Sequence, residues 1–138
     1  MKYLFEWTPA ISVEDMKIDA QHQRLLGEVN NLLSYVVSGK DEKIVDDSVA
    51  FLDEYITDHL AYEEEYMAKH KYPDIEKHIE YHKDFIVRYE LFKQKLKDGV
   101  SRESLVLEIE QYIGNWWLNH IGIADKKYAE YIKTHELK

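Results

Sequence analysis

The sequence contains no cysteine, which excludes disulfide bonds, thiolate zinc sites, iron–sulfur clusters and cysteine nucleophiles. Only two prolines and five glycines occur in 138 residues, which favours few turns and long regular elements. Basic residues are also scarce: 18 Lys and Arg stand against 27 Asp and Glu, a net charge of −9. This balance argues against a nucleic-acid or anionic-membrane surface among the partners.

Long hydrophobic runs are missing as well. No stretch approaches the roughly 20 apolar residues that a membrane span needs. The N-terminal MKYLFEWTPA has an apolar run of only three residues before Glu6, too short for the core of a signal peptide. We therefore expect a soluble, cytoplasmic protein. Hydrophobic residues make up 45% of the chain, and the length suits one domain, residues 1–138, with a real core.

What the sequence does contain is helical periodicity. Four segments repeat apolar residues at helical spacing, and none alternates as a strand would. Connections of a few residues make successive helices antiparallel neighbours, so the sequence predicts an all-α, antiparallel up-down-up-down four-helix bundle. The predicted helices span about 19–38, 41–70, 73–97 and 101–133.

Capping residues support these boundaries. Asp19 and Ser101 are predicted N-caps, Gly39 follows the first helix, and Pro73 opens the third. Residues 1–18 are predicted to form an ordered N-terminal arm. Its apolar anchors would be Phe5, Trp7 and Ile11.

Each predicted helix has one stripe of residues that should face the bundle interior. Imidazoles and carboxylates interrupt all four stripes, although burying an unpaired carboxylate costs several kcal/mol. The predicted inward residues are Leu25, Val29, Leu32 and Val36, preceded by His22; Ile44, Ser48, Phe51, Tyr55, His59, Glu63 and Met67; Ile75, His78, His82, Phe85, Tyr89, Phe92 and Leu96; and Leu105, Ile109, Tyr112, Trp116 and His120, with Asp125 beyond them.

Taken one at a time, these polar residues have ordinary explanations, such as a hydrogen-bonded core histidine or a solvated pair one helical turn apart. Taken together they align. They fall near the start of the first and third helices and near the end of the second and fourth, which is one end of an antiparallel bundle. Bundles hold metals with such side chains from facing helices. The candidate metal ligands are His22, His59, Glu63, His78, His82, His120 and Asp125, whereas His70 and His135 are predicted to face solvent.

The spacing of His120 and Asp125 differs from that of the other pairs. They are five residues apart with Gly122 between them, and five steps of a regular α-helix turn a side chain by about 140°. If both point into one site, the backbone must depart from α geometry between them. We predict a one-residue π-type bulge or a local break eased by Gly122.

These residues, in this order, resemble the bacterial hemerythrin family, and the chain is identified as a single-domain member. The resemblance covers about Trp7 to Tyr131. It rests on Asp19-x-x-His22, His59-x-x-x-Glu63-Glu64-x-x-Met67, Tyr72-Pro73, His78-x-x-x-His82, Trp116 with Asn119-His120-Ile121, and Asp125-x-x-Tyr128.

The resemblance implies a non-haem di-iron centre, two Fe ions cycling between Fe2+ and Fe3+ with an oxo or hydroxo bridge. One iron would be bound by three histidines and the other by two, with both carboxylates bridging and an open position for dioxygen on the second iron. The implied ligands are His78, His82 and His120 for the first iron, His22 and His59 for the second, and Glu63 and Asp125 as bridges.

The implied function is reversible binding of O2, for storage, delivery or sensing, without enzymatic turnover. Five neutral imidazoles against two carboxylates favour Fe(II) and a reversible reaction. The competing hypothesis is a di-iron peroxidase, oxidase or nitric-oxide-handling enzyme on the same scaffold. The expected partners are O2 and a protein acceptor of O2, with the chain a monomer or weak oligomer.

An apolar surround of Phe51, Tyr55, Trp116 and Trp117 is expected to exclude water from the site. Family members commonly carry Trp-Leu where this chain has Trp116-Trp117. One hypothesis is that the bulk of Trp117 narrows the approach to the second iron, while its N–H adds a donor. The alternative is that Trp117 is simply a larger core residue.

Overall fold

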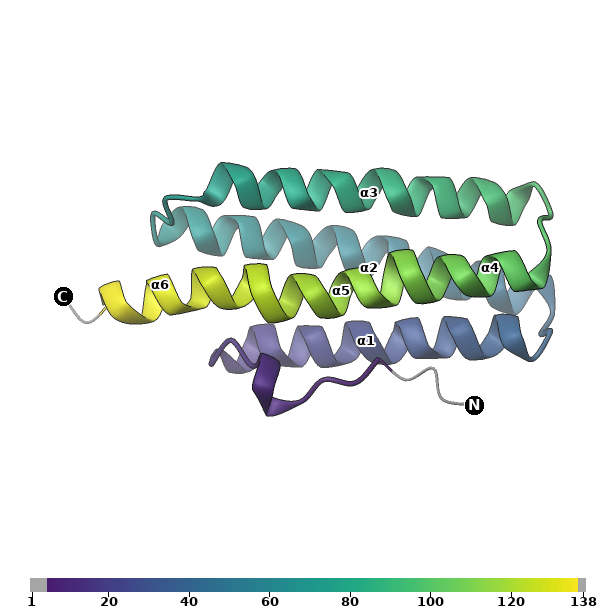
Figure 1. The fold of residues 1–138 in the computed structure, drawn as a ribbon, viewed down its shortest axis with the longest axis horizontal. Coiled ribbons are helices and arrows are strands. Elements are labelled where there is room, and N and C mark those ends of the chain that lie inside the picture. Colours follow the sequence, from purple (N-terminus) through teal and green to yellow (C-terminus); the bar gives the residue numbers. More distant parts are fainter. Residues whose placement is uncertain (1–4, 137–138) are drawn as a thin grey trace.

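The computed structural model describes residues 5–136, and four helical rods run side by side through them (Figure 1). The first three rods are α1 (Met16–Val37), α2 (Glu42–Lys69) and α3 (Ile75–Lys97). The fourth is continuous and consists of α4 (Arg102–Glu108), the π-helical turn η2 (Ile109–Gly114), α5 (Asn115–Asn119), the π-helical turn η3 (His120–Asp125) and α6 (Lys126–Glu136). The predicted all-α four-helix bundle is confirmed.

Two of the predicted helix starts were wrong. The first helix begins at Met16, because the side chain of Asp15 accepts a hydrogen bond from Ile18 N (3.0 Å) and caps it. Asp19 lies in the first turn and instead accepts a hydrogen bond from Val13 N (2.9 Å). The third helix begins at Ile75, since Pro73 and its neighbour form a turn before it.

The other two capping predictions are confirmed. Ser101 accepts a hydrogen bond from Ser104 N (3.2 Å), as an N-cap does. Gly39 follows α1 with φ +67°, a left-handed conformation that glycine adopts without a Cβ clash.

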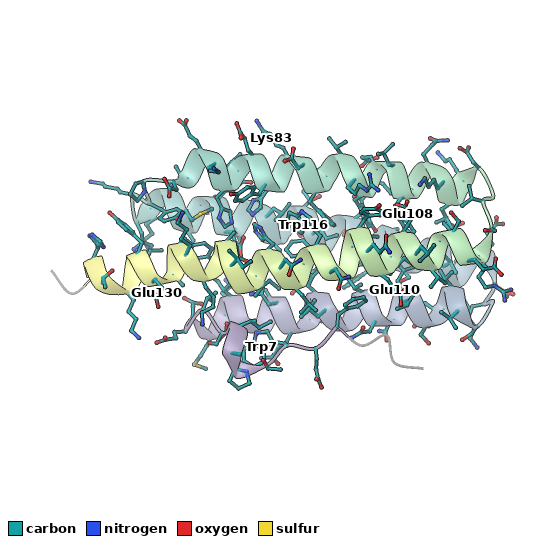
Figure 2. All side chains as sticks on the ribbon, in the orientation of Figure 1. Trp7, Lys83, Glu108, Glu110, Trp116 and Glu130 are labelled. Atoms are coloured by element: carbon teal, nitrogen blue, oxygen red, sulfur yellow. The ribbon has the colours of Figure 1, made fainter. Side chains whose placement is uncertain are left out.

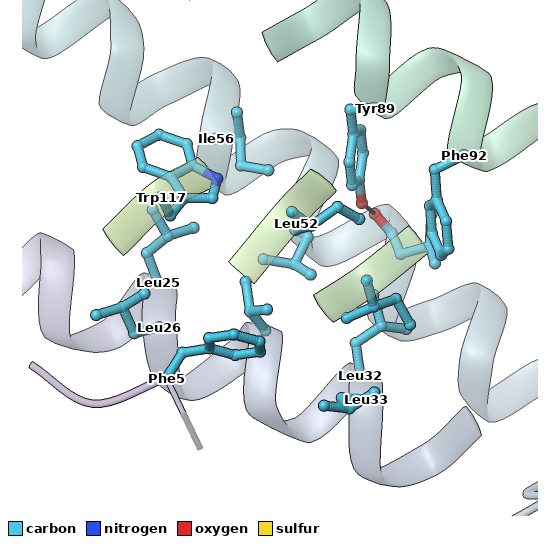
Figure 3. Packing of buried hydrophobic residues seen from close by; sticks show 14 of the residues in the cluster. Phe5, Leu25, Leu26, Leu32, Leu33, Leu52, Ile56, Tyr89, Phe92 and Trp117 are labelled. Carbon is cyan, nitrogen blue, oxygen red and sulfur yellow. Dashed lines mark hydrogen bonds between the residues drawn. The ribbon is translucent and has the colours of Figure 1, made fainter. Parts of the chain in front are cut away.

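In its first half the second helix buries a different stripe from the predicted one, whereas His59, Glu63 and Met67 are buried as predicted. Ile44 and Phe51 are 40% and 39% exposed. Two apolar stripes lie side by side on this helix, and the aliphatic one is continuous with the buried polar residues farther along. Its members are Val45, Val49, Leu52 and Ile56, which belong to the larger core cluster. Figure 3 shows Leu52 and Ile56 among the side chains of the other rods.

The fourth rod keeps one face inward through steps of four residues. Over twenty residues of a regular α-helix, steps of four residues would rotate the inward position around the helix axis by about 200° in total. Each one-residue π insertion reduces this rotation by about 100°. The two π turns therefore return the last position to the side of the first. Tyr112, predicted inward, is accordingly 39% exposed. The buried positions are Leu105, Ile109, Ile113, Trp117, Ile121 and Asp125.

The segment before α1 lies along the bundle and includes the short helix η1 (Pro9–Ile11). Phe5 is buried: its N–H donates to Asn30 Oδ1 (2.9 Å), its carbonyl accepts from Asn30 Nδ2 (3.1 Å), and its ring packs against Gly114. Trp7 and Ile11 are partly buried against the core, and Figure 2 shows Trp7 on the segment that precedes α1. Residues 1–4 of the predicted arm lie outside the described residues.

Within the described part of the chain, none of the helices combines the length and the apolar composition that a membrane span needs.

Candidate metal centre

The structure brings all seven predicted site residues together, inside the bundle and with very little exposure. His22, Glu63 and Asp125 are fully buried, and the other four are 2–6% exposed. They come from α1, α2, α3 and the π turn η3. Every rod of the bundle therefore contributes at least one polar side chain to a single buried cluster.

The carboxylate of Glu63 faces histidines on two sides. Its Oε2 atom lies 3.1 Å from His22 Nε2 and 3.3 Å from His59 Nε2. Its Oε1 atom lies 3.2 Å from His82 Nε2. One oxygen therefore serves a set made of His22 and His59, and the other serves a second set.

The carboxylate of Asp125 is arranged in the same way. Its Oδ2 atom lies 3.1 Å from His22 Nε2. Its Oδ1 atom lies 3.0 Å from His78 Nε2 and 3.1 Å from His120 Nε2. The cluster thus has a two-histidine set and a three-histidine set, His78, His82 and His120, with both carboxylates shared between them.

The donor atoms converge without satisfying one another. His82 Nε2 and His120 Nε2 face each other at 3.2 Å. Among the described residues, several buried atoms have no partner in hydrogen-bonding geometry: His59 Nε2, His78 Nε2, Glu63 Oε1 and both carboxylate oxygens of Asp125. Buried polar atoms normally find partners. Within each set the ligand atoms all lie within 4.8 Å of one another, so the residues present fit metal ions of the kind that imidazole and carboxylate bind.

Hydrogen bonds at Nδ1 fix the orientation of two of the histidine rings, those of His59 and His82. His59 Nδ1 is 2.6 Å from Gln21 Oε1, and His82 Nδ1 is 2.9 Å from Glu64 Oε2. Each Nδ1 donates to its oxygen, which leaves the Nε2 lone pair for the centre of the cluster. The role of Gln21 could not be predicted from the sequence. Gln21 is next to His22 in the chain, but this position does not reveal that its side chain contacts His59 on another helix.

The backbone of η3 explains how His120 and Asp125 reach the same place. The predicted π-helical turn is confirmed over His120–Asp125. His120 Nε2 and Asp125 Oδ1 are 3.1 Å apart despite the five-residue step. The wider turn removes about 100° of the 140° by which a regular α-helix would separate the two side chains.

Aromatic side chains enclose part of the cluster. Trp117 is fully buried, with its ring centroid 5.8 Å from that of His59 and 5.9 Å from that of His120. Trp116 stacks on His120 at 4.5 Å and projects from the fourth rod toward α3 (Figure 2). The expected contribution of Phe51 was wrong, because that side chain is 39% exposed.

The two remaining histidines do not join the cluster. His135 is exposed and stacks on Tyr131, at 3.9 Å between ring centroids. His70 was predicted to face solvent as well, but it is half-buried because its ring packs against Tyr66, 4.7 Å away.

Comparison with known proteins adds the family. A family model described as "Hemerythrin HHE cation binding domain" matches residues 16–132. The chain belongs to this hemerythrin family. It is 28% identical over 132 residues to "Bacteriohemerythrin" of Stenotrophomonas maltophilia, with 96% of this chain and 84% of the relative covered. It is also 28% identical over 131 residues to "Bacteriohemerythrin" of Clostridium acetobutylicum, with 92% of this chain and 100% of the relative covered.

Without metal, two histidines of this hemerythrin-family cluster, His22 and His78, bind protons more tightly than a free histidine does. Burial lowers the pKa of His22, but the adjacent carboxylates of Asp125 and Glu63 outweigh burial and raise it to about 10. The same balance raises the pKa of His78 to about 9. Burial raises the pKa of both carboxyls, yet the surrounding histidines hold the pKa of each below its usual range. The carboxylates are therefore ionised, and the histidines carry the compensating charge.

Proposed function

We propose that this cluster binds two iron ions and that the iron centre binds dioxygen reversibly. The observation that carries the proposal is the sharing of the carboxylates, because Glu63 and Asp125 each offer one oxygen to each histidine set. The proposed ligands are His78, His82 and His120 for one iron, His22 and His59 for the other, and Glu63 and Asp125 as bridges.

The unequal histidine sets support a place for a small ligand. With two shared carboxylates, an iron at the three-histidine set would have five protein donors, and an iron at His22 and His59 would have four. The second iron would therefore keep the more open coordination shell. Fully buried Trp117 lies against His59 and restricts water on this side. A small, uncharged molecule such as O2 suits such a site better than a large or charged substrate.

The donor set favours a carrier over an enzyme. Five neutral imidazoles place less negative charge on the metals than a carboxylate-rich site does, and this favours the reduced state. Iron held there would supply the electrons that dioxygen accepts on binding and returns on release. The protein's own contribution is to fix the rings through Gln21 and Glu64 and to keep the surroundings dry.

The test is anaerobic loading with Fe(II), followed by admission and removal of O2 while the visible spectrum is recorded. We expect about two irons per chain and a charge-transfer band that appears with O2 and disappears under argon. Asp125→Ala should lose the bound iron and the O2-dependent band. His135→Ala should keep the iron and the band, because His135 is exposed and away from the cluster. A band that never reverses, with steady consumption of peroxide, nitric oxide or a reductant, would support the enzyme hypothesis instead.

A further inference from the structure

Tyrosines are concentrated around the candidate metal centre in a way that the proposed function does not use. The sequence has eleven tyrosines and four phenylalanines. The smaller of the two core clusters, built around Ile18, Met67 and Ile132, contains or contacts five tyrosines and no phenylalanine. Its tyrosines are Tyr62, Tyr66, Tyr72, Tyr128 and Tyr131.

The larger core is composed differently. It buries or contacts three phenylalanines, Phe5, Phe85 and Phe92, and three tyrosines, Tyr35, Tyr55 and Tyr89, among the described residues. Phenylalanine would fill the smaller core as well as tyrosine does, without a hydroxyl that needs a partner. Phenols differ from phenyl rings chiefly in giving up an electron far more readily. The excess of phenols at one end therefore points to redox chemistry as well as packing.

Tyr128 connects these phenols to the metal centre. It is fully buried, and its hydroxyl donates a hydrogen bond to Glu63 Oε2 (3.2 Å). Its ring centroid lies 5.4 Å from that of His78. A phenol with a carboxylate at hydrogen-bonding distance can lose an electron and pass its proton to that oxygen in one step. Tyr128 is thus an oxidisable side chain hydrogen-bonded directly to a candidate metal ligand.

Two branches lead from Tyr128 toward the outside of the bundle. One passes to Tyr66 (6.1 Å between ring centroids) and on to Tyr62 (6.4 Å). The other passes to Tyr72 (6.2 Å) and on to Tyr131 (5.6 Å). Tyr128 and Tyr72 are buried, whereas Tyr62 and Tyr131 are half-exposed. Each branch therefore runs from the buried cluster to a side chain that a dissolved reductant can reach.

We propose that these five tyrosines form a relay that carries oxidising equivalents from the metal centre to the surface. The relay would protect an oxygen-binding centre against hydrogen peroxide. Reduction of one H2O2 to two waters takes up two electrons and two protons. When this reaction leaves an oxidising equivalent at the centre, Tyr128 supplies the electron and its phenolic proton moves to Glu63 Oε2.

Tyr66 or Tyr72 then gives one electron to the Tyr128 radical, which takes its proton back from Glu63. Each outer tyrosine releases its phenolic proton as it is oxidised and regains one when it is reduced, so the two protons consumed in forming water come in the end from the reductant. A surface tyrosyl radical takes one electron and one proton from a reductant of the ascorbate class. Two ascorbate monoanions thereby convert one H2O2 into two waters and leave two ascorbyl radicals. The relay rests on the proposed function, since it needs iron in the cluster.

The experiment mixes iron-loaded protein with hydrogen peroxide without reductant, freezes the mixture rapidly and records the EPR spectrum. Peptide mass spectrometry of thawed samples then locates oxidised and cross-linked tyrosines. We expect a tyrosyl radical in the parent, with oxidation at Tyr62 or Tyr131, and loss of both signals when ascorbate is present. Metal-free protein should give neither signal.

Three variants separate a relay from packing. Tyr128→Phe should lower the radical yield per bound iron to the level of metal-free protein. The double variant Tyr66→Phe with Tyr72→Phe should keep a radical but lose oxidation at the surface tyrosines. Tyr112→Phe is the matched control, because Tyr112 is an exposed tyrosine on the same rod, held against Arg88 at 3.5 Å, and it should behave as the parent.

The outcomes distinguish the two proposals. A parent that holds iron and shows the reversible O2 spectrum, yet forms no tyrosyl radical, overturns the relay and leaves the proposed function standing. The same holds if Tyr128→Phe forms as much radical per iron as Tyr112→Phe. A parent that binds no iron overturns both.

Discussion

At the scale of single residues, a hydrogen bond to Nδ1 sets the direction of the free nitrogen in two of the candidate histidine ligands. His82 has a carboxylate behind it, from Glu64, and His59 has an amide, from Gln21. A carboxylate makes the ring it binds a stronger donor than an amide does, because it withdraws more of the Nδ1 proton. The two proposed iron positions are therefore supported by different chemistry.

Glu64→Gln should weaken iron binding without unfolding the bundle. The amide still accepts the hydrogen bond from His82, but it lacks the charge, and losing such support costs roughly tenfold in metal affinity. Competition with a chelator measures the change. Glu65→Gln is the control, because Glu65 is the neighbouring exposed acid. Equal affinities for the two variants would remove Glu64 from this role.

Trp117 is the residue most suited to control access to the proposed second iron. It touches His59, whereas Trp116 stacks only on His120 among the candidate ligands. Its indole Nε1 has no hydrogen-bond partner among residues 5–136. The bulk of the ring fills space beside His59.

Trp117→Leu should speed azide binding and autoxidation of the O2-bound form, with O2 binding retained. The smaller side chain opens space next to His59, and the cavity should lower the free energy of unfolding by about 2 kcal/mol. Stopped-flow and autoxidation rates measure the effect. Trp116→Leu removes the same volume beside the three-histidine set and serves as control. Rates matching the parent's would make Trp117 a packing residue only.

At the scale of elements, the fourth rod depends on its two π turns. They keep Leu105 and Asp125 on the same face over twenty residues. The second turn, η3, also sets the direction of a proposed bridging carboxylate. A π turn in this rod therefore acts as a phase correction, placed where the chain has one residue more than a regular α-helix would need.

Deleting Ile123, which is 71% exposed, tests this explanation. The deletion leaves His120 and Asp125 four residues apart, so a regular α-helix places both on one face and iron should be retained. Inserting one alanine after Ile123 makes the step six, which turns Asp125 by about 240° from His120, and iron should be lost. Iron content per chain measures both variants. Loss of iron on deletion, as on insertion, would contradict the phase argument.

At the scale of the whole molecule, the fold buries the negative charge of the candidate metal centre, and this charge needs compensation. Two ionised carboxylates lie in a fully buried cluster, and in metal-free protein the protons on His22 and His78 compensate them. Metal ions bind neutral imidazole, so they take the place of these protons. Loading the site is therefore an exchange of protons for metal.

Proton release on loading follows from the sign of the shifts. The pKa of His22 is raised to about 10 and that of His78 to about 9, so both are protonated at pH 8 in metal-free protein. Anaerobic Fe(II) binding at pH 8 should release about two protons per chain, and fewer as the pH rises through 9 to 10. Calorimetry in buffers of different ionisation enthalpy counts them. Binding without proton release at pH 8 would disprove the exchange.

Much of the site could be predicted from the sequence because its ligands follow helical spacing. His59 with Glu63 and His78 with His82 are one turn apart, and spacing alone puts each pair on one face. The five-residue step from His120 to Asp125 required a departure from α geometry, and the π turn η3 supplies it. Local periodicity determines these features, since each depends only on residues within one or two turns.

Only the tertiary structure decided which of two adjacent apolar stripes of α2 faces inward. Ile44 and Val45 both fit a helical repeat, and packing against the other rods selects Val45. The tertiary structure was also needed to find the π turn η2 and the contact between Gln21 and His59, which lie 38 positions apart on different helices. Periodicity along one helix carries no information about the rotation of its neighbours. That rotation is set by how side chains of all four rods fill one interior.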